Sequence, residues 1–351
     1  MSGSSGTAEA QAVAGRPLRQ LRAGTRSRYR QVVGALVALV LLLAVGALVW
    51  GVGPAEVLAH LQHLVGLGGD RSFAVRLRLP RVAMSVAVGV GFGLAGALFQ
   101  VVLRNPLASP DIIGVTGGAS LAGAWAILFG GMTGMWVSLA AFAGAAAVAA
   151  VILLLSFTGE LSGYRFVLVG VGLAFLCQSG IGYLITRSQV DDVRSALVWM
   201  VGSIGTPTWG AVATLVLCLL VLLPLAGYAG WRLRAMQLGD ESAAGLGLRV
   251  TRSRLLVLGV GVALAAVATA FAGPVAFVAF MSGPIARRLL PAAGAALLPS
   301  ALVGAVVVLA AELVAEQLLT GLEVPVGIVT GVVGAPYLLW LLATGTRRSS
   351  R

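Results

Sequence analysis

Long uninterrupted apolar runs constrain this chain more than any other feature of its sequence. The runs Val32–Trp50 and Ala211–Leu225 contain no charged side chain and do not alternate apolar with polar residues. A transmembrane helix needs about 20 apolar residues in a row, whereas a membrane β-strand alternates. The chain has 351 residues, of which 59% are apolar and 10% charged, and its mean hydropathy is +0.99. We therefore expect an all-α polytopic membrane protein with about ten transmembrane helices, and this composition argues against a water-soluble enzyme.

The apolar runs and the charges divide the chain into a membrane domain between two basic tails. Residues 1–30 are rich in Ser, Gly, Ala and Arg, so we expect a disordered tail. The first apolar run is longer than the roughly 7–15 apolar residues of a signal peptide, which favours a retained helix. Residues 31–343 form the predicted membrane domain, and residues 344–351 form the second tail. Ten spans are expected near residues 31–52, 82–102, 112–130, 134–157, 165–186, 208–229, 254–272, 275–290, 298–319 and 326–343, the eighth of them interrupted by Gly and Pro.

Every basic residue in the chain is an arginine. The 24 arginines outnumber the 12 acidic residues and give a net charge of +12. Without lysine the chain cannot contain the Gly-Lys-Ser/Thr phosphate-binding loop of an ATPase. Arginines scattered between apolar runs indicate membrane orientation rather than nucleic-acid binding, because cytoplasmic loops carry the excess of positive charge. With both termini in the cytoplasm, 18 arginines fall inside and 6 outside, and the exception is an outer cluster of Arg76, Arg78 and Arg81.

Neither the cysteines nor the histidines point to a metal or catalytic site. Cys177 and Cys218 each lie inside an apolar run and are expected to behave as small hydrophobic residues. His60 and His63 lie in the first outer loop, and without neighbouring cysteines we interpret them as surface residues. The chain contains no His-Glu-x-x-His and no Gly-x-Ser-x-Gly motif. We therefore expect no cofactor, no metal and no enzymatic activity in this chain itself.

The segment Gln237–Val250 is the strongest functional candidate on the cytoplasmic side. It follows Arg232 and Arg234 and is long for a simple connection. Its glycines bracket a short helix-like stretch, and Asp240 and Glu241 at the start of that stretch suit the positive end of a helix dipole. A solvated loop is the alternative interpretation.

Two glutamates near the end of the ninth predicted span form an unusual pair. Glu312 and Glu316 are four residues apart, and like charges at this spacing on a helix repel each other. Because carboxylates inside a membrane normally find partners, our hypothesis is that Glu316 turns to an outer arginine, either Arg78 or Arg81. A compensating base from a docking partner is the alternative.

An ordered set of short motifs runs through residues 75–343. In chain order they are Arg78-Leu-Pro-Arg81, Gly93-Leu-Ala-Gly96, Arg104-Asn-Pro-Leu-Ala-Ser-Pro110, Gly114-Val-Thr-Gly-Gly-Ala119, Ala196-Leu-Val-Trp-Met-Val-Gly-Ser203, Leu238-Gly-Asp-Glu-Ser-Ala-Ala-Gly-Leu-Gly247, Gly273-Pro-Val-Ala-Phe277, Ile285-Ala-Arg287 and Glu323-Val-Pro-Val-Gly327. Each is weak alone, but in this order the set resembles the permeases of the iron-siderophore and cobalamin class of ABC importers. The resemblance implies a type II ABC importer permease architecture, a second permease subunit, separate ABC ATPase subunits and an extracytoplasmic substrate-binding protein.

The resemblance also implies roles for particular residues. Arg78 and Arg81 match arginines that pair with glutamates of the substrate-binding protein, although arginines here could also extend to lipid headgroups, and our hypothesis adds Glu316 to this docking set. The coupling segment 237–250 matches the part that docks into the ATPase and includes Gln237, Leu238, Gly239, Asp240, Glu241, Ala244, Leu246 and Gly247. The translocation path and its gate are expected to involve Gln100, Asn105, Pro106, Ser162, Gly163 and Tyr164, with an interfacial anchor as the alternative for the tyrosine.

The chain departs from the family pattern at two places. Gly283-Pro284 stands where a Pro-His pair is common, so any role of that histidine is absent. Glu316 stands where family members commonly have an arginine that pairs with an acid four residues earlier.

These features predict the transmembrane subunit of an ABC importer that carries a ferric siderophore across a bacterial cytoplasmic membrane. Cobalamin or haem import within the same family is one alternative. A secondary transporter driven by protons or sodium is an alternative from another class, because such proteins place ionisable residues and broken helices at the bilayer midplane. No nucleic-acid partner is expected, and the expected neighbours are the partner subunits, the cargo and the lipid bilayer.

Overall fold

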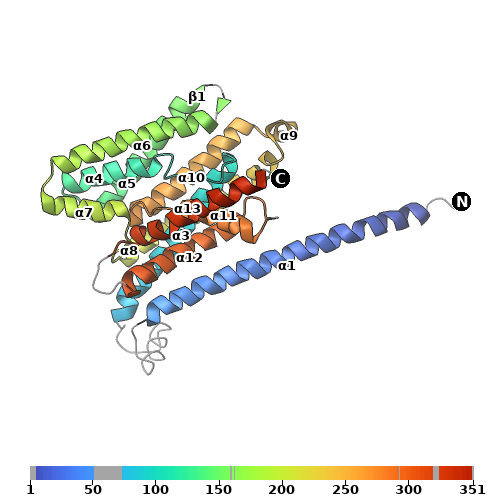
Figure 1. Cartoon of the computed structure of the whole chain (residues 1–351), viewed down its shortest axis with the longest axis horizontal. Helices are drawn as coiled ribbons and strands as arrows, with labels where there is room; N and C mark the ends of the chain where they lie inside the picture. The colour runs from blue at the N-terminus through green and yellow to red at the C-terminus, as the bar shows by residue number, and fades with distance from the viewer. Residues whose placement is uncertain are drawn as a thin grey trace.

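The computed structural model describes residues 5–50, 73–158, 160–161, 163–291, 293–318 and 324–349, with side chains over 24–50, 77–156, 165–291, 293–316 and 324–344. These residues form a bundle of α-helices (Figure 1). The helices are α1 (Ser5–Val49), α3 (Phe73–Val102), α4 (Val115–Leu128), α5 (Met135–Ser156), α6 (Gly163–Thr186), α7 (Val190–Val201), α8 (Trp209–Met236), α9 (Asp240–Gly245), α10 (Val250–Ala272), α11 (Val278–Leu289), α12 (Leu297–Leu313) and α13 (Val326–Ser349). A π-helical turn, η1 (Val314–Leu318), continues α12, and strands β1 (Phe157–Thr158) and β2 (Glu160–Leu161) form a small antiparallel hairpin.

The predicted all-α membrane fold is confirmed. Within the described residues, eight helices are long and apolar enough to cross a membrane: α1, α3, α5, α6, α8, α10, α12 with η1, and α13. The remaining two predicted spans correspond to the shorter helices α4 and α11. The 14 residues of α4 rise only about 21 Å at 1.5 Å per residue, less than the roughly 30 Å of a bilayer core.

Two elements differ from the sequence prediction. Helix α7 was not expected, because its 12 residues begin with two acids and are too short to read as a span. Helix α1 starts at Ser5, well before the apolar run, and extends beyond the bundle (Figure 1). The Ala, Arg, Gln and Leu residues before that run are good helix formers. The disordered tail over residues 1–30, like the other domain boundaries, stays a prediction.

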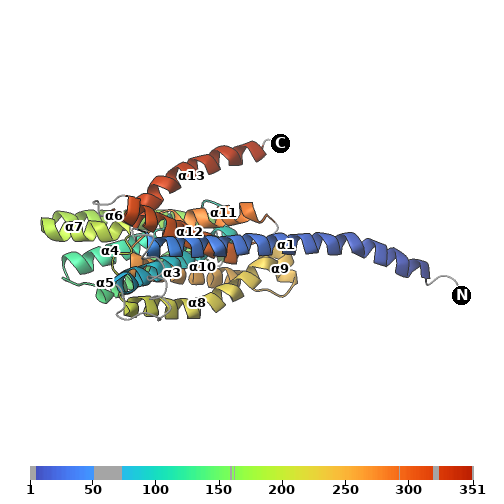
Figure 2. The same ribbon diagram turned by 90° about the horizontal axis from the view of Figure 1, so that it is seen from below.

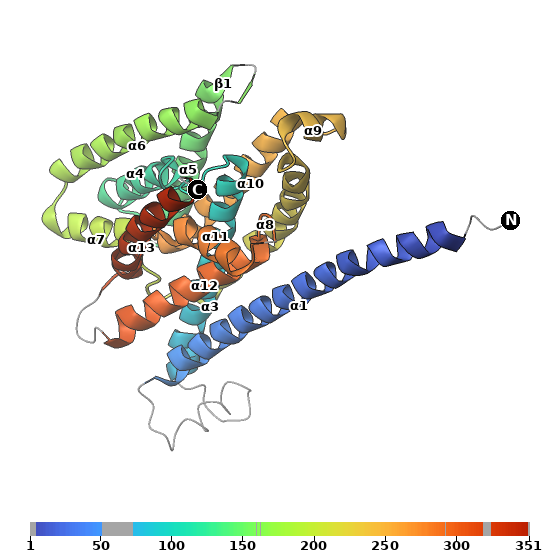
Figure 3. The ribbon, with the colours of Figure 1, turned by 45° about the vertical axis from the view of Figure 1, so that its right-hand side comes forward.

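Helix α3 is the central element of the bundle. Most of its apolar span is buried, and it packs against α1, α8, α10, α11 and α12. Figure 3 shows α3 passing between these helices, and Figure 2 shows α13 turning away from them. Arg81 lies near one end of α3, and Arg104 follows its other end.

Glycines on α3 allow its neighbours to approach closely. A Cβ on Gly89 would lie 2.5 Å from the carbonyl oxygen of Gly304 in α12, and a Cβ on Gly93 would lie 2.3 Å from that of Ser300. On another face, Gly96 meets the backbone of Ala279 in α11. Small residues at helix interfaces are the usual means of tight packing in lipid. Larger residues at these positions would push α11 and α12 away from α3.

Candidate functional site

The first charged cluster joins one end of α3 to the end of α12. We call Arg78, Arg81, Glu312 and Glu316 the Arg81 cluster. Arg81 Nε lies 2.5 Å from Glu312 Oε1, and Arg81 Nη1 lies 2.8 Å from Glu316 Oε1. The predicted pairing of Glu316 with Arg78 or Arg81 is therefore found, with Arg81 as the partner, whereas the placement of this end on the outer face stays a prediction. One guanidinium offsets the repulsion between two carboxylates on successive turns.

The π-helical turn η1 and helix α1 complete the Arg81 cluster. Glu316 lies in η1, and π turns within helices frequently occur at functional sites. Arg78 takes no part in the ion pairs, because its Nη1 donates to the carbonyl oxygens of Leu48 at 3.2 Å and Trp50 at 2.7 Å. The end of α1 has carbonyl groups without partners within the helix, and an arginine satisfies them. The cluster thus ties α1, α3 and α12 together.

The second charged cluster lies at the other end of α3. We call Arg104, Asp240 and Arg254 the Asp240 cluster. Asp240 Oδ1 lies 3.0 Å from Arg104 Nη2, and Asp240 Oδ2 lies 2.5 Å from Arg254 Nη2. Asp240 is in the first turn of α9, and Arg254 is in the first turns of α10. Arg104 also donates to the carbonyl oxygen of Met236 at 3.1 Å, so α9 is fastened to α3, α8 and α10.

Arg104 takes an unusual backbone conformation to make these contacts. It has φ +51°, a left-handed conformation that costs an L-residue about 1–2 kcal/mol. Its amide donates to the carbonyl oxygen of Val101, and the Asn105 amide donates to that of Gln100, which is the Schellman arrangement that ends many helices. Glycine usually occupies this position. Arginine is strained at this φ where glycine would not be, but its guanidinium reaches Asp240.

The coupling segment contains the predicted helix and exposes its apolar side chains. Helix α9 covers Asp240–Gly245 with Asp240 and Glu241 in its first turn, as predicted. Ala243 is buried against the bundle, whereas the flanking Leu238 and Leu246 are 67% and 65% exposed. Glu241 and the remaining predicted coupling residues, Gln237, Ala244 and Gly247, are also exposed, while Gly239 is half-buried and precedes the helix. Two exposed leucines beside a fastened helix form a raised apolar surface at this end of the bundle.

The predicted path residues near the end of α3 differ in the exposure of their side chains. Gln100 is buried, its Nε2 donates to the Phe280 carbonyl oxygen at 2.9 Å, and its Oε1 accepts from Arg287 Nη2 at 2.7 Å. Gln100 therefore links α3 to α11 within the subunit. Asn105 and Pro106 are exposed, and Asn105 Oδ1 accepts a hydrogen bond from the Leu107 amide at 2.9 Å, which shapes the turn. Their roles in the path stay predictions.

The Gln100 contact explains one departure from the family pattern. A Cβ on Gly283 would lie 2.1 Å from Gln100 Oε1. Any side chain at residue 283 would displace the amide from its contacts with α11. Glycine at this position therefore lets Gln100 keep its contacts with α11.

Asp111 was missed in the sequence because nothing marks it as different from a loop residue. It lies in the connection between α3 and α4, and burial raises its pKa from 3.8 to about 7, an effect that a contact with Thr116 only partly reverses. Both of its carboxylate oxygens are buried.

Several predicted residues lie outside the described part of the structure. Ser162 is not described, and of Gly163 and Tyr164 only the backbone is, at the start of α6. His60 and His63 also lie outside the described residues. Among the described residues, no group of three or more His, Cys, Asp or Glu side chains could hold a metal ion. The gate at 162–164 stays a prediction.

Comparisons with known proteins agree over almost the whole chain. Residues 35–344 match the FecCD transport family. The Fe(3+)-citrate import system permease protein YfmE of Bacillus subtilis (strain 168) is 35% identical over 329 residues, which cover 92% of this chain and 98% of that protein. The ferric enterobactin transport system permease protein FepG of Escherichia coli (strain K12) is 33% identical over 306 residues, covering 86% and 93% of the two chains.

A solved structure has the same fold. It is described as an inward-facing conformation of a metal-chelate type ABC transporter, and it superposes with a TM-score of 0.76 at 28% sequence identity. The match covers 90% of this chain and 99% of that one. The likeness therefore extends over most of the helical bundle.

Proposed function

This chain belongs to the FecCD transport family, and we propose that it is the membrane-spanning permease subunit of an ABC importer for a ferric siderophore. Permeases of this family are transport subunits of the bacterial membrane that work with ATPase and substrate-binding partners. The observation that carries the proposal is the fastening of the exposed helix α9 to the central helix α3 through Asp240 and Arg104. A permease without its own ATPase motif needs such a connection, because movement of a separate ATPase subunit must be transmitted to its membrane helices.

Cargo of the ferric-chelate class is supported by the relatives. The two named relatives handle Fe(3+)-citrate and ferric enterobactin, and the matching structure is described as of metal-chelate type. A path for such a bulky cargo lies between two permease subunits in our proposal. Three glycines have open space around them, the exposed Gly172 and Gly182 on α6 and the half-buried Gly331 on α13. They give a second subunit small-residue faces of the kind that favour close helix contact.

ATPase docking on the coupling segment is supported by its exposed leucines. Leu238 and Leu246 stand on either side of α9, and a partner would remove both from water. A protein interface usually has an apolar centre with a polar rim, and Gln237 and Glu241 supply polar neighbours here. In the proposed orientation this end faces the cytoplasm, where arginines outnumber those on the other side.

Docking of the substrate-binding protein is assigned to the Arg81 cluster at the opposite end. Arg78 and Arg81 are partly exposed, and Glu316 is 29% exposed. An acidic group of the partner would compete with Glu316 for the Nη1 edge of Arg81. The Arg81–Glu316 ion pair is then the element that docking changes, whereas the more buried Arg81–Glu312 pair remains.

An uptake experiment in cells tests the proposed function. Cells that lack this protein should lose uptake of radioactive iron supplied as a ferric siderophore, and the wild-type chain should restore it. Depletion of ATP should stop the restored uptake. Full uptake in the absence of the chain, over a panel of ferric siderophores, citrate and haem, would contradict the proposal.

A cysteine crosslink tests the coupling surface separately. Leu246→Cys should form a crosslink to an ATPase subunit that carries cysteines around its docking groove. The matched control is Leu220→Cys, because Leu220 is 60% exposed but lies within the span of α8. A crosslink from residue 220 and none from residue 246 would move the docking surface elsewhere.

A further inference from the structure

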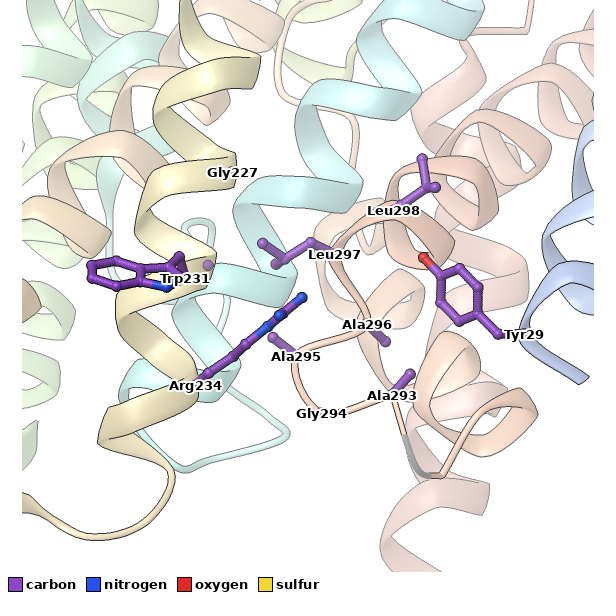
Figure 4. Close-up of a pocket in the computed structure, with 11 residues that line it drawn as sticks. Tyr29, Gly227, Trp231, Arg234, Ala293, Gly294, Ala295, Ala296, Leu297 and Leu298 are labelled. Carbon is purple, nitrogen blue, oxygen red and sulfur yellow. The ribbon is translucent and has the colours of Figure 1, made fainter. Parts of the chain in front are cut away.

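A cavity of about 690 Å³ lies between α1, α8 and the connection that precedes α12. Its walls are Tyr29 of α1, Gly227, Gly230, Trp231 and Arg234 of α8, and the stretch from Ala293 to Leu298. Figure 4 shows Arg234 and Tyr29 on opposite sides of the connection that carries Ala295 and Ala296, with Leu297 and Leu298 above them in this view. Among the described residues that line the cavity, none is acidic. It therefore combines an apolar floor with one positive charge and one hydroxyl group.

Arg234 differs from Arg232 on α8 in having no partner among the described side chains. Arg232 donates to the Tyr228 hydroxyl at 2.6 Å and to Ser253 Oγ at 3.1 Å, and its guanidinium stacks on the Tyr228 ring. Over the residues whose side chains are described, Arg234 has no ion pair and no side-chain hydrogen bond. An arginine can form two parallel hydrogen bonds to a phosphate group. The cavity thus offers an unused anion-binding side chain.

Aromatic residues place the cavity at the level of the membrane surface. Tyr228 and Trp231 stack with their ring centroids 6.1 Å apart and are 44% and 62% exposed. Tyr and Trp concentrate where a membrane protein meets lipid headgroups, and Tyr29 of α1 reaches the same cavity. An anion that reaches Arg234 here comes from the layer of headgroups, and Leu298, which is 51% exposed, continues the wall toward the acyl chains.

We propose that this cavity binds one anionic phospholipid. The phosphate pairs with Arg234, the Tyr29 hydroxyl donates to a phosphate or glycerol oxygen, and an acyl chain follows Gly227, Leu297 and Leu298 along the bundle. Basic pockets between transmembrane helices recognise acidic headgroups by this chemistry. The bound lipid joins α1 to α8, two helices at the margin of the bundle. That the lipid comes from the cytoplasmic leaflet rests on the proposed orientation, whereas the site itself does not.

Lipid retention by the purified protein tests the proposal. The full-length protein, with any subunits that co-purify, is reconstituted in nanodiscs of equal phosphatidylglycerol and phosphatidylcholine, extracted with mild detergent, and analysed for retained lipid by mass spectrometry. Wild type should retain phosphatidylglycerol in preference to phosphatidylcholine. Arg234→Gln should lower the retained phosphatidylglycerol about tenfold, because a charge-assisted pair is lost. Arg288→Gln is the matched control, since Arg288 stacks on Trp340 and donates to Thr344.

A steric variant separates the cavity from its charge. A Cβ on Gly227 would meet no atom within 4 Å, so Gly227→Leu fills the cavity without disturbing the backbone and should abolish retention while Arg234 remains. Gly34→Leu on α1 is its control, because Gly34 also has open space but does not line the cavity. A thermal-unfolding curve for each variant shows whether it is folded.

Three results would overturn the proposal. They are equal retention by wild type and Arg234→Gln, equal retention of the two lipids by wild type, and displacement of phosphatidylglycerol by millimolar inorganic phosphate, which would assign the site to a soluble anion. The measurement needs neither ATP nor cargo. A protein that retains lipid but transports no siderophore would contradict the proposed function and leave the lipid site in place.

Discussion

The two ends of α3 hold the same kinds of charge in opposite proportions. In the Arg81 cluster one guanidinium is shared by two carboxylates, whereas in the Asp240 cluster one carboxylate is shared by two guanidiniums. The first cluster is more enclosed, since the side chain of Glu312 is 6% exposed and that of Asp240 is 42% exposed. A buried charge depends on its partner, and an exposed one contributes little to stability. The Arg81 cluster therefore holds helices together, and the Asp240 cluster can transmit movement at low cost.

The largest effect is expected from removing the shared arginine. Arg81→Gln leaves Glu312 buried without a cation, which should lower the free energy of unfolding by about 3–5 kcal/mol. Thermal unfolding of the purified protein in detergent measures this. The double variant Arg81→Gln, Glu312→Gln should recover most of the loss, because no charge is then left unpaired. If Arg81→Gln alone were as stable as wild type, the Arg81 cluster would not stabilise the fold more than the Asp240 cluster does.

A pH-dependent effect is expected near the other end of α3. Burial raises the pKa of Asp111 to about 7, so its ionised form disfavours folding, and stability falls as pH rises from about 4 through about 7. Asp111→Asn should therefore stabilise the protein by a few kcal/mol at pH 8, and by progressively less as the pH is lowered toward 4. Unfolding midpoints between pH 5 and pH 8 give the dependence. A constant difference between variant and wild type would contradict it.

Sequence patterns predict the spans because lipid imposes a length and a polarity on each of them. They also predict a partner for Glu316, because a carboxylate near the membrane cannot stay alone. They do not distinguish Arg78 from Arg81, since the choice depends on how α1 and α12 pack on α3. For the same reason Asp111 and Arg254 escaped notice, because their positions depend on contacts between segments distant in the chain.

The order of motifs along the chain also predicted the coupling segment 237–250, with a short helix that has Asp240 and Glu241 in its first turn. It did not show that Asp240 is already held by Arg104 and Arg254. For Gln100 the sequence did not show the side-chain contacts, and its role in the path stays a prediction. A glutamine in an apolar run looks like a path residue, but here its polar groups are occupied by α11 and Arg287. Only the packing of α3 on α11 reveals this.

A smaller effect is expected at the exposed member of the Arg81 cluster. Glu316→Gln removes a partly exposed ion pair and also the repulsion from Glu312, so stability should change by less than about 1 kcal/mol. It frees Arg81 Nη1 for a carboxylate of the substrate-binding protein, and docking should become a few-fold tighter. Titration of the binding protein onto the reconstituted permease measures the dissociation constant. Unchanged affinity would remove Glu316 from the docking surface, and weaker binding would indicate a basic partner group.

The smallest change in stability, with a separate effect on coupling, is expected at Arg104. Arg104→Gly relieves a left-handed backbone conformation that costs about 1 kcal/mol and loses a half-exposed ion pair of similar size. Unfolding should thus be nearly unaffected, while transport per ATP hydrolysed should fall several-fold because α9 is released from α3. Asp240→Asn should reproduce the fall in transport. Normal transport by both variants would show that this cluster does not couple the two processes.

ATP-driven uptake by reconstituted vesicles tests the central claim most directly. The permease is inserted with its ATPase and second permease subunits, the substrate-binding protein carries ferric siderophore outside, and ATP is sealed inside. We predict that iron accumulates only when all components and ATP are present, and that a proton uncoupler has no effect. Uptake against a gradient by this chain alone, or uptake stopped by the uncoupler and indifferent to ATP, would contradict the account.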